Sequence, residues 1–325
     1  MPNNNNITTD ISLAAELLKT GKLVAFPTET VYGLGADANN PEAIANVFAT
    51  KGRPTNHPLI VHIAKTADLD RWAQNIPTSA WQLATHFWPG PLTLILEKQD
   101  HVSPLITGGQ QTIALRIPAH PQTLQLLQKI GSGLVGPSAN KYGRVSPTTA
   151  LHVAADLGNE IAAILDGGAC DVGIESTIVD LTDDMPIIRR SGAITADDIG
   201  QVLGLKVQTS VNSQANIRTP GDQLSHYAPI TPIKLIKNTE LISTVKTYLQ
   251  LKKKFSVLSL QNKPDFLPTQ IYWQQVNNDA TIYMHDLYAN LRVHDELNNA
   301  AIIIEIPPNN NDWLAIQDRL ARAAF

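Results

Sequence analysis

The stretch Leu23–Ile63, which reads LVAFPTETVYGLGADANNPEAIANVFATKGRPTNHPLIVHI, decides the fold of the first part of the chain. It opens with the short apolar run Leu23–Phe26, and Pro27 then ends any ladder because proline has no N–H to donate. A loop with two hydroxyl groups, one carboxylate and two glycines follows, up to Gly35. This order predicts a buried strand that leads into a polar loop.

The second half of the stretch predicts a helix followed by a strand. Asn40 is a typical N-cap, Pro41 suits the first helical position, and Gly52 suits the end of the helix. The run 59–63 then alternates, which places His62 on the strand face opposite its immediate neighbours in the chain. His62 is therefore expected on a strand face rather than in a loop.

Two cations lie between this helix and this strand. Because Arg53 precedes Pro54, its backbone is biased towards extended geometry, so Lys51 and Arg53 can project from the same side of the chain. The sequence thus predicts two positive charges that face one spot.

Hydrophobic periodicity predicts the remaining elements. In the first part it indicates helices over residues 11–20, 78–88 (capped by Thr78), 121–130, 148–157 (capped by Thr148) and 195–203 (with a capping-box-like start at Thr195 and Asp198), and strands over 92–96, 112–117, 134–136, 161–165 and 187–190. Residues 175–177 are expected at the mouth of another strand. In the second part, strands over 234–236, 255–260, 271–273 and 301–306 alternate with helices over 239–250, 286–297 and 312–323. The predicted fold class is α/β, also describable as α+β: a twisted open sheet with helices, followed by a smaller Rossmann-like three-layer domain.

Composition excludes several classes of protein. Hydrophobic residues make up 43% and charged residues 17% of the 325, which is typical of a globular chain, and no run of 18 apolar residues suggests a membrane span. The polar start MPNNNNITTD lacks a signal region, so we expect a cytoplasmic protein without a membrane partner. Cys170 is the only cysteine, which excludes an internal disulfide and a cysteine-based zinc site.

The charge distribution argues against tight binding of tRNA. Residues 1–210 carry 14 Lys and Arg against 19 Asp and Glu, and residues 211–325 carry 11 against 10. Neither part has the basic excess that binding to a phosphate backbone usually requires.

The segment GSGLVG at 131–136 matches the dinucleotide fingerprint in letters but not in context. A predicted helix precedes it and Pro137 follows it, whereas the fingerprint needs a strand before and a helix after. No G-x-x-x-x-G-K-[ST] is present either. If the chain binds a nucleotide, it therefore binds it without a dinucleotide-binding fold and without a P-loop.

Four candidate residues have two readings each. Arg116 lies among small residues on an alternating run, where it can pair with a structural carboxylate or grip a ligand carboxylate with its two-pronged donors. Ser138 and Asn140 can be turn formers or can hold phosphate and sugar oxygens. His62 can be a satisfied strand histidine instead of a ligand contact.

Several motifs occur in one order along residues 7–230: PTETVYGLG, KGRP, HPLIVHI, FWPGPLTLIL, ALRIPAHP, GPSAN, GIESTIVDL and HYAP. Together they resemble the YrdC-domain family of threonylcarbamoyl-adenylate synthases in its two-domain long form. The resemblance implies that ATP, L-threonine and bicarbonate give threonylcarbamoyl-adenylate and pyrophosphate. This is the first step of threonylcarbamoyl-adenosine formation beside the tRNA anticodon, and a downstream tRNA-modifying transferase complex would receive the adenylate.

The resemblance also implies a YrdC-like catalytic domain over residues 1–208, a linker over 209–231 that reaches over the active site, and a C-terminal domain over 232–325. It implies two sets of binding residues, with Lys51 and Arg53 also as the catalytic cations. The ATP set is Lys51, Arg53, His57, Thr112, Ser138, Asn140, Ser146, Arg190 and Tyr227. The L-threonine set is Thr30, His62, Arg116 and Ser176, with Arg116 on the carboxylate.

The chain departs from the family pattern in two places. Ser191 replaces the usual proline after Arg190, and residues 222–225 lack the basic and aromatic residues that often precede HYAP. The second departure leaves two readings for Tyr227, a nucleotide contact or an ordinary loop tyrosine. Because no protein metal cage is visible, Mg²⁺ is expected to bind through the ATP phosphates.

Two alternatives to this function stay open from the sequence. An RNA-binding or ribosome-associated module without adenylation activity would show salt-sensitive RNA affinity and no threonine-dependent release of pyrophosphate. An adenylating carbamoyl-transfer domain of the hydrogenase-maturation type would carry zinc-finger and acylphosphatase segments, and the chain has neither.

Overall fold

The computed structural model describes residues 6–209, 218–220 and 226–325. The chain divides into two compact units, one formed by residues 1–142 and 146–222 and the other by residues 143–145 and 223–325. The predicted domain boundaries, after residues 208 and 231, lie on either side of the division at residue 222. Most of the predicted linker, residues 210–217 and 221–225, lies outside the described residues.

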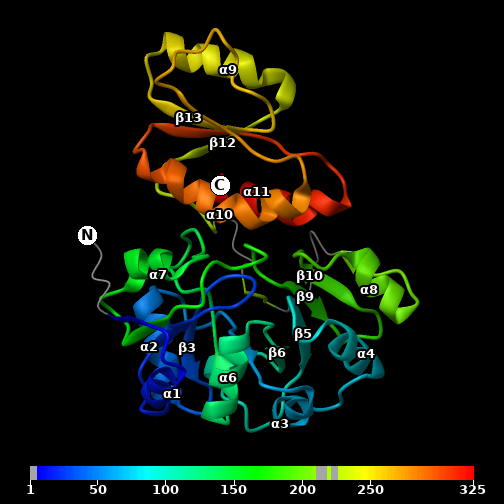
Figure 1. The fold of residues 1–325 in the computed structure, drawn as a ribbon. Helices are drawn as coiled ribbons and strands as arrows, with labels where there is room; N and C mark the ends of the chain where they lie inside the picture. Colours follow the sequence, from blue (N-terminus) through cyan, green and yellow to red (C-terminus); the bar gives the residue numbers. More distant parts are fainter. Residues whose placement is uncertain (1–5, 210–217, 221–225) are drawn as a thin grey trace. The chain divides into compact units, whose positions relative to one another are not determined.

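One mixed sheet runs through the first unit (Figure 1). Within the described residues its strands follow the order β1 (Ile7–Thr8), β8 (Ala163–Leu165), β2 (Val24–Phe26), β3 (Gly33–Asp37), β7 (Leu134–Val135), β4 (Ile60–His62), β6 (Thr112–Arg116), β5 (Leu92–Glu97), β9 (Thr177–Asp180), β10 (Ile187–Arg190) and β11 (Gln208–Thr209). Strands β4 and β6 are parallel, as are β5 and β9, whereas β5 and β6 are antiparallel. Neighbours in the sheet are thus often far apart in sequence.

Helices connect these strands. They are α1 (Ile11–Lys19), α2 (Pro41–Lys51), α3 (Leu69–Trp72), α4 (Thr78–Phe87), α5 (Pro104–Thr107), α6 (Pro121–Ile130), α7 (Ala150–Leu157) and α8 (Ala196–Leu203), with the 3-10 turn η2 (Thr66–Asp68). Among the described residues, no helix of the chain has the length and apolar content that a bilayer span requires.

Helix α2 has the bounds that its capping residues predict. The Asn40 Oδ1 accepts a hydrogen bond from the Ala43 N–H at 3.0 Å, and Gly52 ends the helix in the left-handed region at φ 64°. The capping box predicted at Thr195 and Asp198 is also present. Local chemistry fixes these helix ends.

Three predicted helix ends are wrong. Helix α7 is capped by Thr149 and not by Thr148, because it is the Thr149 hydroxyl that accepts from the N–H at 152. Helix α4 has Pro77 at its N-cap position and no side-chain cap, and it ends at Phe87. Helix α10 (Ala280–Glu296) begins six residues before its predicted start, where Asp279 accepts two backbone N–H bonds.

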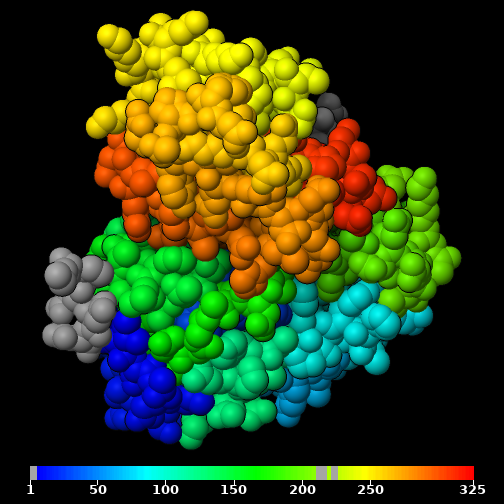
Figure 2. Space-filling view, turned by 45° about the horizontal axis from the view of Figure 1, so that its top comes forward, coloured from blue at the N-terminus to red at the C-terminus, as the bar shows by residue number. Residues whose placement is uncertain are grey.

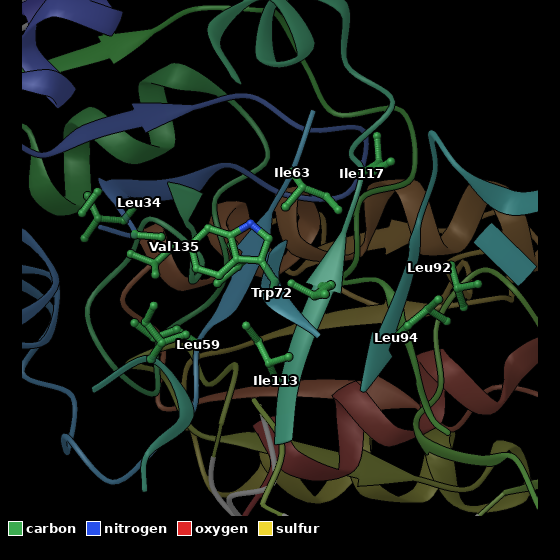
Figure 3. Close-up of a cluster of buried hydrophobic side chains, with 14 of the residues drawn as sticks. Leu34, Leu59, Ile63, Trp72, Leu92, Leu94, Ile113, Ile117 and Val135 are labelled. Carbon is green, nitrogen blue, oxygen red and sulfur yellow. The ribbon is translucent and has the colours of Figure 1, made fainter. Parts of the chain in front are cut away.

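The two faces of the first sheet bury different helices. Leu23 and Ala25 face a core that includes α2, whereas Val24 and Phe26 face a core with α1 and α6. Figure 3 shows the part of the first core in which Leu59, Ile63 and Ile113 gather with Trp72. The face that bears Phe26 also bears His62, because the two rings meet edge to face with centroids 5.4 Å apart.

The second unit is a parallel sheet with helices on both faces, as predicted. Its strands follow the order β12 (Ile233–Ile236), β15 (Ala301–Glu305), β13 (Phe255–Ser259) and β14 (Tyr272–Gln275), and every pair is parallel. Helix α9 (Asn238–Gln250) packs on Phe255 and Val257, and α10 packs on the opposite face at Ser256 (Figure 1). The 3-10 turn η3 (Asn311–Trp313) and α11 (Leu314–Ala323) end the chain. In Figure 2 the segment around residue 250, where α9 ends, lies at the surface of this unit.

A buried histidine of α10 makes the second unit sensitive to pH. His294 Nδ1 lies 2.7 Å from the Ser256 hydroxyl and Nε2 lies 3.1 Å from Gln274 Oε1, and burial lowers the pKa of His294 to about 4. In the unfolded chain the His294 side chain takes up a proton near pH 6.5, whereas in the folded chain it does so only near pH 4. The free energy of unfolding should therefore be highest above about pH 6.5 and should fall by on the order of 3 kcal/mol as the pH is lowered towards 4.

Urea unfolding of the wild type and of His294→Gln across this range checks the prediction. The amide of the variant does not titrate, so its stability should depend less steeply on pH. Equal slopes for the two proteins would show that His294 is not the titrating group.

Candidate active site

Lys51 brings two distant segments of the first unit together. It ends α2 with 3% of its surface exposed, and its Nζ donates to the carbonyls of Ser138 at 2.5 Å and Asn140 at 2.6 Å. Burial, and after it the positive charge of Arg53, lowers the pKa of Lys51 well below its ordinary value. The K-x-R and S-x-N segments, which are 87 residues apart, therefore meet at one point.

Arg53 lies beside the same point. Its Nη2 donates to the Pro58 carbonyl at 2.9 Å, and its guanidinium lies 5.9 Å from the centre of the Tyr142 ring. The His57 ring meets the same tyrosine at 5.7 Å. The parallel register Ile60↔Ala114 carries Thr112 level with Pro58. Four predicted ATP contacts, counting Lys51, thus gather around the start of β4.

Ser146 and Ser176 are held by neighbouring side chains, of which Glu175 and Thr93 are not among the predicted contacts. The Ser146 hydroxyl donates to Glu175 Oε1 at 2.6 Å. The Ser176 hydroxyl lies 2.7 Å from that of Thr93 and accepts from Arg190 Nη2 at 3.1 Å. The predicted threonine contact Ser176 and the predicted nucleotide contact Arg190 therefore touch each other.

A polar row crosses the sheet through two of the residues predicted to contact threonine. The register pairs His62 on β4 with Arg116 on β6, and the antiparallel pairing Leu94↔Leu115 places Thr93 on β5 opposite Arg116. In the neighbouring row on the same face, Ile60, Ala114 and Ile95 are buried together, and Ile178, which pairs with Thr93, packs against them. On this face of the sheet, the polar residues His62 and Arg116 thus lie next to the buried apolar residues Ile60 and Ala114.

Arg116 is fixed from three directions. Its Nε donates to the Gly90 carbonyl at 3.1 Å, its Nη1 donates to the Thr30 hydroxyl at 2.9 Å, and its Nη2 lies 2.7 Å from Glu29 Oε1. The structural-carboxylate alternative is thus realised in this structure. The contact with Glu29 is a close ion pair but is poorly aligned as a hydrogen bond, so Nη2 and Oε1 both keep hydrogen-bonding capacity.

His62 is a neutral histidine within this row. Burial, and after it the charge of Arg116, lowers the pKa of His62 to about 3. The side chain is 2% exposed, and its Nδ1 has no hydrogen-bond partner among the described residues. An unpartnered buried ring nitrogen favours a ligand contact over a purely structural role.

Gly136 leaves room for this histidine. A methyl group added there would lie 2.8 Å from His62 Nδ1 and 2.7 Å from the Phe26 ring. Gly136→Ala should therefore displace His62, weaken threonine binding and cost about 1–3 kcal/mol of stability. Calorimetric titration with threonine, together with thermal unfolding, checks both effects.

Gly109→Ala is the control, because it has open space around the added methyl group and meets only the backbone strain of its φ of 83°. If Gly136→Ala and Gly109→Ala weaken threonine binding by the same factor, the packing argument for Gly136 is contradicted.

Tyr227 belongs to the second unit and is buried there. It is 1% exposed, stacks on Tyr288 with centroids 5.9 Å apart, and lies under the Arg319 guanidinium at 5.2 Å. Its φ of 63° is unusual for a residue other than glycine. The nucleotide contact predicted for it stays a prediction.

The sequence missed the residues that orient the predicted contacts. Glu29 and Thr28 stand in the PTET motif, Thr93 in FWPGPLTLIL and Glu175 in GIEST, so the motifs themselves were the available signal. Their partners lie far away in sequence, and only the order of the strands shows what they hold. No three His, Cys, Asp or Glu side chains of the described residues gather as a metal site would require.

Comparison with known proteins places these residues in a family. A family model described as "Telomere recombination" matches residues 16–192, and one described as "Threonylcarbamoyl-AMP synthase, C-terminal domain" matches residues 194–325. The threonylcarbamoyl-AMP synthase of Bacillus subtilis is 40% identical over 321 residues, which are 97% of this chain and 92% of that protein. The protein of the same name from Pyrococcus abyssi is 44% identical over 230 residues, which are 70% of this chain and 68% of that protein.

A solved structure agrees with both units. The crystal structure of Pyrococcus abyssi Sua5 complexed with L-threonine is 36% identical and has a TM-score of 0.90. The match covers 97% of this chain and 94% of the other.

Proposed function

The chain belongs to the threonylcarbamoyl-AMP synthase family, and from this premise we propose that it converts L-threonine, bicarbonate and ATP into L-threonylcarbamoyl-adenylate and pyrophosphate. The product supplies the threonylcarbamoyl group for modification of the adenosine beside the tRNA anticodon. A downstream transferase that takes up the adenylate, and a cytoplasmic location, belong to the same proposal.

One observation supports the proposal above the others: cationic and hydroxyl groups from distant segments gather in two sets at strand β4, one around its start and one level with its last residue. The K-x-R and S-x-N segments meet through hydrogen bonds of Lys51. The polar row that contains His62 and Arg116 crosses strands β4 and β6. Such an arrangement suits a phosphate-bearing and a carboxylate-bearing substrate bound end to end.

The reaction needs threonine captured as a carbamate, the carbamate oxygen held against the α-phosphate, and charge relieved as pyrophosphate leaves. Fixed donors can supply most of this by positioning and electrostatics. Arg53 and the one Lys51 N–H that is not held by a carbonyl are assigned to the triphosphate. Ser138, Asn140, Ser146 and Arg190 complete the nucleotide side.

On the threonine side, Arg116 is assigned to the carboxylate, and Thr30, His62 and Ser176 surround it. The neutral His62 cannot repel the ammonium group of threonine, and its free Nδ1 can bond the substrate. Mg²⁺ would be held by the ATP phosphates, where it neutralises charge on the leaving pyrophosphate.

The proposal is tested by incubating the protein with ATP, bicarbonate and each amino acid in turn and measuring pyrophosphate. Threonine should give pyrophosphate and the adenylate, and the other amino acids should give far less. Salt-sensitive RNA affinity with no threonine-dependent pyrophosphate would instead indicate an RNA-binding module.

A further inference from the structure

Glu29 is a buried carboxylate in contact with the arginine assigned to threonine. Its side chain is 6% exposed, and its Oε1 lies 2.7 Å from Arg116 Nη2. The Ala119 N–H donates to Oε2 at 3.0 Å, and the Val172 N–H donates to the Glu29 backbone carbonyl at 2.7 Å. Both the backbone and the carboxylate of Glu29 are therefore fixed in place.

The carboxylate still has capacity to accept hydrogen bonds. A carboxylate offers about four acceptor positions, and here Oε2 has one aligned donor. Oε1 has no aligned donor among the described residues, although it is buried and next to a guanidinium. Most buried polar atoms in proteins have a hydrogen-bond partner, so a buried acceptor without an aligned donor is a candidate to bind a ligand group.

The free substrate supplies a partner of the right charge. Threonine is a zwitterion at neutral pH, with its ammonium group attached to the carbon that carries its carboxylate. When the substrate carboxylate lies on the Arg116 guanidinium, the ammonium therefore lies within reach of the carboxylate that contacts the same guanidinium. The adjacent guanidinium of Arg116 and carboxylate of Glu29 thus match the carboxylate and the ammonium group of a free amino acid.

Neighbouring hydrogen bonds keep this pair oriented. Arg116 Nη1 donates to the Thr30 hydroxyl, which lies 2.8 Å from that of Thr28, and the Thr28 hydroxyl donates to the Val31 carbonyl at 2.6 Å. Arg116 cannot turn away from Glu29 without breaking this chain.

We propose that Glu29 accepts a hydrogen bond from the substrate ammonium group and so makes the site selective for free α-amino acids over carboxylates that lack the amine. This inference rests on the proposed function, because it presumes that threonine binds with its carboxylate on Arg116. Glu29 thus acts on the substrate directly as well as through Arg116.

Calorimetric titration of the full chain with L-threonine and with (R)-3-hydroxybutyrate tests the proposal, because the second ligand is threonine without its amino group. The wild type should bind threonine about 10- to 100-fold more tightly, as expected for a charge-assisted hydrogen bond. In Glu29→Gln, which keeps the size and the Ala119 contact, the ratio should fall to within roughly threefold. Glu305→Gln is the matched control: it neutralises a buried glutamate of the second unit that accepts hydrogen bonds from the Ser259 hydroxyl and the Leu260 N–H, and it should leave the ratio unchanged.

An unchanged ratio in Glu29→Gln, with both ligands weakened equally, would overturn the proposal and show that Glu29 only orients Arg116. If Glu29→Gln does not fold, Glu29→Asp gives the same readout, because it keeps the charge but withdraws it by one methylene group. Failure of the proposed function looks different: the wild type would then bind no threonine and release no threonine-dependent pyrophosphate.

Discussion

We expect Arg53→Ala to lower threonine-dependent exchange between ATP and pyrophosphate by at least 10²- to 10³-fold, a loss typical of removing one fixed charge from a transition-state site. The Arg53 guanidinium lies beside the S-x-N segment, whose two carbonyls accept hydrogen bonds from the Lys51 Nζ. Its Nη2 donates to the Pro58 carbonyl at 2.9 Å, and the guanidinium lies 5.9 Å from the centre of the Tyr142 ring. Losing the hydrogen bond to Pro58 should cost about 1–2 kcal/mol of stability.

Arg71→Ala is a closely matched control. Arg71 also donates to one carbonyl, that of Gly131 at 3.2 Å, and also lies over an aromatic ring, that of Trp72 at 5.7 Å. Arg71 lines a pocket with Leu127, Gln128 and Ser132, and none of the residues that line this pocket is a predicted site residue, so exchange should be unchanged in this variant. Full exchange in Arg53→Ala with a normal melting temperature would contradict the assignment of Arg53 to the triphosphate.

Arg116→Ala should have the second large effect, on stability as well as on binding. It leaves the Glu29 carboxylate buried without its counter-charge, which typically costs about 3–5 kcal/mol. Threonine affinity should fall by on the order of 100-fold, because the carboxylate loses a guanidinium partner. Urea unfolding and calorimetric titration measure the two effects separately.

Two further variants separate stability from recognition. Arg189 forms a buried ion pair with Asp180 at 2.7 Å in the same unit, so Arg189→Ala should lose similar stability but keep threonine affinity. Combining Arg116→Met with Glu29→Gln removes both charges and should restore part of the stability but not the binding. A double variant no more stable than Arg116→Ala would show that the two charges are not coupled.

Local sequence was enough wherever neighbouring residues complete a structure by themselves. Asn40, Pro41 and Gly52 lie within one helix and its caps, so α2 was predicted to the residue. The start of α10 was missed because its first turns mix exposed and buried side chains, and Asp279 was not recognised as its cap. The cap of α7 was missed because two adjacent threonines were equally suitable in sequence.

The sequence by itself determined the two-part α/β organisation and, through its motifs, the candidate contacts with ATP and threonine. Caps, proline positions and alternation act over a few residues, and a linear pattern can record them. Only the tertiary structure decided that Lys51 donates hydrogen bonds to the Ser138 and Asn140 carbonyls and that Arg116 forms an ion pair with Glu29. The second contact depends on the order β2, β3, β7, β4, β6 in the sheet, which joins strands that are distant in the chain by hydrogen bonds that no local pattern specifies.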